Sequence, residues 1–151
     1  QMCIRDRGVY GTVPAPQKKR SMPYRRITPR DMWVDDPASP LYNQHFVLKH
    51  DPVTPWEFKQ QMKLNDYAHS LKLFIRHNAA DGRQKPVPGA GSSIFFHIWR
   101  RDGGAPTAGC TAMSEENLRA MIAWLDPSRH PLYILLPARE YLRLRRAWGL
   151  P

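Results

Sequence analysis

One cysteine and one histidine near the middle of the chain have the residue types and the spacing for acyl-transfer chemistry. Cys110 follows His97 by 110 − 97 = 13 residues, and the two stand at the ends of a glycine-rich segment. A cysteine attacks a carbonyl as its thiolate, and a histidine within hydrogen-bond reach supplies the base. Small residues before Cys110 let a substrate carbonyl approach backbone N–H groups. Cys110 and His97 are therefore candidate catalytic residues, with the N–H groups of Gly109 and Cys110 as a candidate oxyanion hole.

A structural interpretation of the same two residues stands beside the catalytic one. A lone cysteine is more often a small buried apolar residue than a nucleophile, and a histidine in an apolar strand is usually a core residue. The spacing by itself leaves both interpretations open. Two cysteines are too few for a disulfide framework, so Cys110 is expected to be a free thiol.

The other histidines give no sign of a metal site. None of them shows the close spacing that metal ligands usually have, so we expect no metal and no other cofactor. They are His45, His50, His69, His77 and His130.

Two predicted strands and one predicted helix surround the cysteine and the histidine. In residues 70–77 the aliphatic side chains at 71, 73 and 75 alternate with Lys72, Phe74 and Arg76, so one face of this strand is expected to be buried. The apolar run 93–99 carries His97 and predicts a central strand. After Cys110 the apolar period changes to 3.6 residues, which predicts a helix over residues 114–125 with Ser114 as its N-cap.

The rest of the chain predicts a mostly β, α+β domain, a mixed β-sheet or sandwich with one main helix. Residues 8–40 are rich in proline and basic side chains and are expected to form loop, with a short strand at 8–13. A short helix is expected over 55–62, with Thr54 as N-cap and Pro55 at its first position. We expect another buried strand at 131–137 and a short basic helix at 138–148.

Length and charge limit the number of domains and the kinds of partner. With 151 residues and 42% hydrophobic content, the chain fits one domain, which we place at residues 8–151. Residues 1–7 match nothing downstream, and we expect them to be an artefact or disordered, with the first strands of the fold missing. The net charge of +10 favours polyanions, and the basic residues at 18–30 form either a solvated loop or a polyanion site. No apolar run is long enough for an integral membrane segment.

Two segments around the candidate residues carry a family resemblance. Residues 89–99 (GAGSSIFFHIW) and 106–114 (PTAGCTAMS) closely resemble the YkuD-type L,D-transpeptidase catalytic domain, in a divergent branch with a T-A-G-C-x-A-M motif. A looser similarity extends from Met22 to the expected strand at 132–136. The resemblance implies that Cys110 attacks the carbonyl before D-alanine in a peptidoglycan stem peptide. It also implies that His97 is the base, that the backbone carbonyl of Ile98 orients it, and that Gly109 contributes an oxyanion N–H group.

The resemblance leaves substrate binding less defined. Many family members carry a histidine just before the Gly-Cys pair and an arginine or asparagine two residues after the cysteine, where this chain has Ala108 and Ala112. Arg100, Arg101 and Thr111 are candidates for substrate binding. The two arginines suit the stem-peptide carboxylates, but a solvated turn is an equally good interpretation of them.

These observations predict an L,D-transpeptidase, a transferase with a cysteine acyl-enzyme, in the bacterial cell envelope or periplasm. An L,D-carboxypeptidase of the same fold, with water as the acceptor, is an alternative. A second alternative is a non-catalytic, basic polyanion-binding module, which predicts salt-sensitive binding and an unreactive thiol. For the leading prediction we expect peptidoglycan stem peptides as partners, no nucleic acid, and a monomer.

Overall fold

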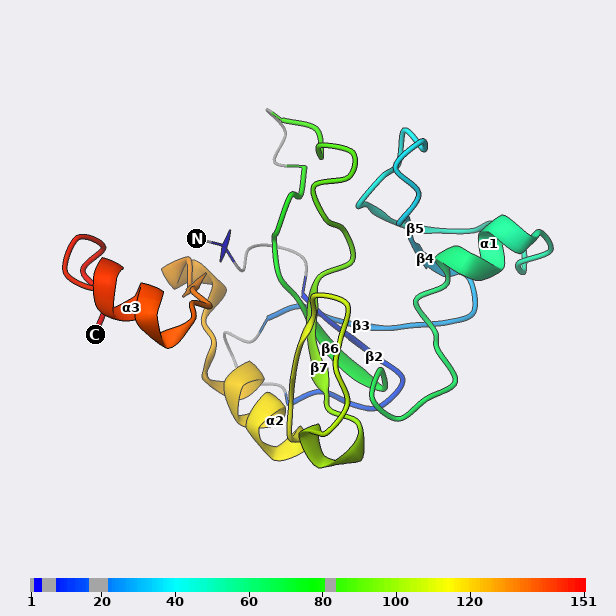
Figure 1. Cartoon of the computed structure of the whole chain (residues 1–151). Helices are drawn as coiled ribbons and strands as arrows, with labels where there is room; N and C mark the ends of the chain where they lie inside the picture. Colours follow the sequence, from blue (N-terminus) through cyan, green and yellow to red (C-terminus); the bar gives the residue numbers. More distant parts are fainter. Residues whose placement is uncertain (1, 4–7, 17–21, 81–83) are drawn as a thin grey trace.

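The computed structural model describes residues 2–3, 8–16, 22–80 and 84–151. Its centre is a mixed sheet with strand order β3-β2-β6-β7-β8 (Figure 1). β6 is antiparallel to β2 and to β7, whereas β3 and β8 pair in parallel with β2 and β7. These strands are β2 (Val9–Gly11), β3 (Tyr24–Arg26), β6 (Leu71–Phe74), β7 (Phe95–Ile98) and β8 (Thr111–Met113).

Two small antiparallel pairs and three helices accompany this sheet. One pair joins β4 (Asp31–Trp33) to β5 (His45–Val47), and the other joins β1 (Met2–Cys3) to β9 (Leu132–Tyr133). The helices are α1 (Pro55–Gln60), α2 (Glu115–Trp124) and α3 (Ala138–Leu144), with 3₁₀ turns at Arg101–Gly103 and Pro127–Arg129. Mixed sheets with few helices confirm the predicted α+β class.

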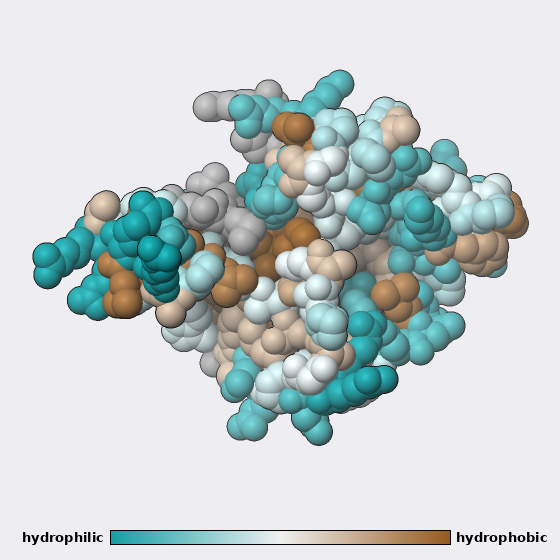
Figure 2. All heavy atoms as spheres, in the orientation of Figure 1, coloured by the Kyte–Doolittle hydropathy of each residue, from teal (hydrophilic) through white to brown (hydrophobic). Residues whose placement is uncertain are grey.

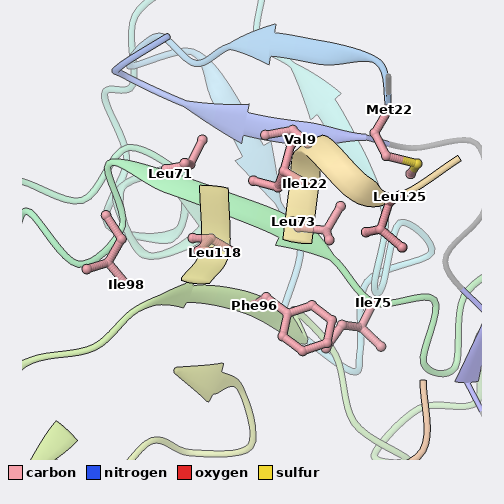
Figure 3. Close-up of a cluster of buried hydrophobic side chains, with 10 residues drawn as sticks. All are labelled: Val9, Met22, Leu71, Leu73, Ile75, Phe96, Ile98, Leu118, Ile122 and Leu125. Carbon is pink, nitrogen blue, oxygen red and sulfur yellow. The ribbon is translucent and has the colours of Figure 1, made fainter. Parts of the chain in front are cut away.

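The main hydrophobic core lies between the sheet and α2, as Figure 3 shows. Leu118 and Ile122 of α2 are fully buried against the sheet. Burial of each such side chain contributes about 1.5–3 kcal/mol to folding. The core cluster consists of Val9, Met22, Leu71, Leu73, Ile75, Phe96, Ile98, Leu118, Ile122 and Leu125.

A second core covers the opposite face of the sheet. There Trp33 of β4 packs on Phe74 and Phe95, with ring centroids 4.3 and 5.0 Å away. In Figure 1, α2 lies on one side of the central strands and α1, β4 and β5 lie on the other. This second cluster consists of Tyr10, Ile27, Trp33, Met62, Phe74 and Phe95, and Cys110 packs against it.

The predicted helices are confirmed, together with their caps. Ser114 Oγ accepts a hydrogen bond from the N–H of Asn117, which satisfies one free donor at the start of α2. Thr54 and Glu57 form a reciprocal capping box at α1, with Pro55 at the first position. The basic helix expected at 138–148 ends earlier, at Leu144.

The strands at 70–77 and 93–99 are confirmed over shorter ranges, β6 and β7, and β6 is buried more completely than the alternating pattern predicted. All four of its residues are buried, including Lys72, which is 4% exposed. The second core covers the face that carries Lys72 and Phe74, so both faces of β6 are buried. Residues 8–40 also form more strand than expected, because β3 and β4 follow β2 there.

The buried strand expected at 131–137 is also wrong. β9 is two residues long, and the side chains of Leu132 and Leu135 are 55% and 66% exposed. β9 pairs with β1 and not with a strand of the central sheet, and of its two residues Tyr133 packs against the main core whereas Leu132 is exposed. Figure 2 shows apolar residues at the surface on both flanks of the molecule. Among the described residues, no helix is long and apolar enough to cross a membrane.

The expectation for residues 1–7 falls mostly on residues outside the described ranges. Met2 and Cys3, which are described, pair in register with Tyr133 and Leu132. The division of the chain at residue 8 stays a prediction.

Candidate active site

The parallel register of β7 and β8 places Cys110 and His97 on the same face of the sheet. His97 lies opposite Ala112, and Cys110, directly before β8, therefore lies beside Phe95. Because side chains alternate along a strand, Phe95, His97 and Cys110 all point away from α2, toward the second core. Two residues of rise and one strand spacing separate the Cα atoms of Cys110 and His97 by about 8 Å.

The imidazole of His97 is buried and has a defined tautomer. Its Nδ1 lies 2.7 Å from the carbonyl oxygen of Ile98, an acceptor, so Nδ1 carries the proton and donates it. Nε2 is left unprotonated and able to accept a proton. Burial lowers the pKa of His97, against the raising effect of the Ile98 bond, so the ring is neutral near pH 7.

The thiol of Cys110 is half-buried and lies against the backbone of the preceding strand. Its Sγ donates to the carbonyl of Ser93 at 3.5 Å and accepts from the N–H of Phe95 at 3.4 Å. In the described part of the chain, Sγ has no hydrogen bond to His97. Burial raises the pKa of the Cys110 thiol, against the lowering effects of the Phe95 N–H and the charge of Lys72. Catalytic hydrogen bonds are often long before substrate binds.

The turn before Cys110 is exposed and is shaped by Gly109. The φ angle of Gly109 is +140°, and a Cβ there would meet Cδ1 of Ile94 at 3.2 Å. Only glycine adopts this conformation readily. The N–H of Gly109 donates to Oγ1 of Thr107 over a long 3.4 Å, and the hydroxyl of Thr107 donates to the carbonyl of Cys110. As an oxyanion donor, Gly109 would have to exchange this weak bond for one to substrate.

A second histidine and a carboxylate support His97 from the segment before β6. The ring of His69 stacks on His97, and its Nδ1 donates to Asp66 at 2.8 Å. Arg100, directly after β7 and Trp99, donates to the same carboxylate. Burial raises the pKa of Asp66, but the bonds from Arg100 and His69 outweigh it and hold the pKa at about 2. Asp66 is therefore ionised and fixes the protonated nitrogen of His69.

The residues expected to bind substrate lie in three different environments. Arg100 is engaged by Asp66, and Arg101 is exposed in the following 3₁₀ turn. Thr111 does not share the face of Cys110, because adjacent residues of a strand alternate, and its hydroxyl hydrogen-bonds the hydroxyl of Tyr133 at 2.8 Å. Substrate binding by Thr111 stays a prediction, and this geometry does not favour a role for its hydroxyl.

Lys72 also belongs to this site, although no sequence motif predicts it. It lies opposite His97 in the register of β6 and β7, and it is almost fully buried. Its Nζ donates to the carbonyl of Met62 at 2.7 Å and lies 5.5 Å from the ring centroid of Phe95. The sequence also does not predict that His69 and Asp66 lie near His97. Tertiary contacts bring them together, and no sequence spacing marks those contacts.

The described residues contain no group of three or more metal-ligating side chains, and the expectation of no cofactor stays a prediction. A cavity of about 330 Å³ lies beside β2 and β3, and its lining includes neither Cys110 nor His97. That lining consists of Gly8, Val9, Tyr10, Pro23, Tyr24, Arg25 and His45.

Comparisons with known proteins give one match. The model of the YkuD family, the L,D-transpeptidase catalytic domain, matches residues 7–134, which include both candidate catalytic residues. Neither the curated proteins nor the solved structures give a match. Because the family model covers most of the 151 residues, the chain belongs to the YkuD family of L,D-transpeptidase catalytic domains.

Proposed function

We propose that this chain is a cysteine L,D-transpeptidase that acts on peptidoglycan stem peptides in the bacterial cell envelope. The observation that carries the proposal is the shared sheet face of Cys110 and His97, with Nδ1 of His97 bonded to Ile98. That arrangement leaves Nε2 able to accept a proton on the face of the sheet that carries the thiol. Membership of the YkuD family supports the choice of reaction.

Acylation begins with transfer of the Cys110 thiol proton to Nε2 of His97. The thiolate sulfur then forms a bond to the carbonyl carbon that precedes D-alanine, and N–H groups at Gly109 and Cys110 stabilise the oxyanion. The C–N bond to D-alanine breaks as His97 returns the proton to the leaving amine. A thioester on Cys110 and free D-alanine are the products.

Release of the thioester repeats these steps in reverse with a new acceptor. His97 removes a proton from the amine of a second stem peptide, the amine attacks the thioester, and the proton passes to the Cys110 sulfur. A water acceptor gives the L,D-carboxypeptidase reaction by the same route. The products distinguish the two reactions, because an amine acceptor gives a cross-linked dimer and water gives a shortened stem.

The proposal is tested by intact mass spectrometry after the protein is mixed with a carbapenem. An activated Cys110 should open the β-lactam ring and add the mass of one drug molecule, and Cys110→Ala should add none. Released D-alanine from tetrapeptide stems provides the second measurement. A folded wild-type protein that gains no adduct and releases no D-alanine would contradict the proposal. Salt-sensitive polyanion binding in its place would favour a binding module.

A further inference from the structure

Lys72 is a buried cation on the same face as Cys110 and His97. Leu71 and Leu73 belong to the core beneath α2, so Lys72 between them points to the opposite face. It lies opposite His97 in the β6–β7 register, and its side chain is held by the Met62 carbonyl and the Phe95 ring. The Lys72 side chain is therefore fixed inside the candidate site.

No carboxylate lies within ion-pair distance of the Lys72 ammonium among the described residues. A buried charge without a counter-ion is costly, and proteins rarely keep one without a partner. Burial lowers the pKa of Lys72 to about 8, and the charges of Cys110 and Asp66 act in the opposite direction. The Cys110 thiolate, which forms during catalysis, is an anion that acts on the Lys72 charge. In return, the charge of Lys72 lowers the pKa of Cys110.

We propose that Lys72 is a positioning residue that stabilises the Cys110 thiolate electrostatically, from the strand on the far side of His97. The inference deepens the proposed function and rests on it for the identity of the nucleophile. Lys72 keeps its protons throughout, and the thiol proton still passes to Nε2 of His97. His97 is neutral before this transfer, so it carries no positive charge with which to favour the thiolate, whereas Lys72 does.

The pH dependence of this effect follows from the groups that face Lys72. Lys72 is cationic below its pKa of about 8, so its stabilisation of the thiolate is present there and weakens as pH rises through that value. Neutral His97 and His69 do not add a competing positive charge near pH 7. The titratable and charged groups around Lys72 and the thiol are Asp66, His69, His97, Arg100 and Cys110.

The test measures the rate at which iodoacetamide alkylates Cys110 from about pH 5 to pH 10, in a Cys3→Ser background. Removal of a cation close to a thiol raises its pKa by one unit or more, so Lys72→Met should react about 10-fold more slowly at pH 7. The difference should narrow above about pH 8. Lys72→Gln, which can still donate to Met62, should react as slowly as Lys72→Met. Lys72→Arg, which keeps the charge, should stay close to wild type.

Lys59→Met is the matched control, because it removes one exposed lysine charge from α1 and should leave the rate unchanged. Alkylation requires no peptide substrate, so this test is independent of transpeptidation. Rates for folded Lys72→Gln that coincide with wild type at every pH would overturn the inference, while intact D-alanine release would leave the proposed function standing. Slow alkylation in Lys72→Met but not in Lys72→Gln would assign the effect to the Met62 hydrogen bond and also overturn it.

Discussion

The imidazole ring of His69 stacks on that of His97, with ring centroids 4.6 Å apart and planes inclined by 27°. The backbone explains this contact, because the N–H of Ile98 donates to the carbonyl of Ala68 directly before His69. On its own side His69 is held by Asp66. The His97 ring is thereby fixed twice, by the His69 stack on its face and by the Ile98 carbonyl at Nδ1.

His69→Ala should lower kcat for D-alanine release about 10-fold, with little change in KM, because misplacement of a base slows the chemical step more than binding. His69→Phe keeps an aromatic surface against His97 and should recover part of the loss. Steady-state kinetics on tetrapeptide stems measure both effects. If Phe and Ala at position 69 gave the same kcat, the stack would have no positioning role.

His97→Ala should reduce kcat by about 10²–10⁴-fold, the usual contribution of a general base. Its thermal unfolding should stay cooperative, since the strand pairing of β7 does not depend on the ring. His50→Ala is the control for loss of a histidine, because His50 is exposed and is not among the residues of the candidate site. Turnover that persists in folded His97→Ala would remove His97 from the mechanism.

The local part of this site could be predicted from sequence, and the long-range part could not. Cys110, His97 and the α2 cap at Ser114 lie within a single segment, since 114 − 97 = 17, and residue type and apolar period mark each of them there. The burial of Lys72 could not be predicted, because its strand alternates like a strand with one face in solvent. The residues that cover the Lys72 face come from β4 and from Met62, and no residue near Lys72 in the sequence indicates that they pack there.

The placement of Thr111 shows the same limit at shorter range. Thr111 is adjacent to Cys110 in sequence, but the β8 register turns its side chain to the face that carries Phe96. Its hydroxyl shares a hydrogen bond with Tyr133, from a segment 22 residues later. Sequence proximity to Cys110 therefore does not predict which face of the sheet the Thr111 side chain lies on, because strand alternation determines it.

Thr111→Val should leave KM for stem peptides unchanged, because the Thr111 hydroxyl does not face the site. The variant should lose about 1 kcal/mol of unfolding free energy with the hydrogen bond to Tyr133. Tyr133→Phe should cost a similar amount, and the double variant should lose little more than either single one, as expected for partners in one bond. A raised KM in Thr111→Val with unchanged stability would contradict this expectation and support Thr111 as a substrate-binding residue.

Asp31→Asn should destabilise the fold in a way that depends on pH. The Asp31 carboxylate is fully buried and accepts hydrogen bonds from Arg25, from the N–H and hydroxyl of Thr28, and from His45. Burial raises its pKa, but these bonds outweigh burial and the net pKa is lowered. Hydrogen bonds to a charged group contribute about 1.5–3 kcal/mol, and Asp31→Asn should lose about this much.

The sign of the pH effect on Asp31 follows from its lowered pKa in the folded state. The ionised carboxylate stabilises the fold above the unfolded-state pKa, about 3.9, and this contribution is lost as pH falls through the lower folded-state value. Urea unfolding at pH 7 should therefore show a large difference between wild type and Asp31→Asn. As pH falls through the lowered folded-state pKa the difference should shrink, because wild-type Asp31 itself becomes protonated. A difference that stays constant down to acid pH would mean that the amide disrupts packing and that the charge of Asp31 contributes nothing.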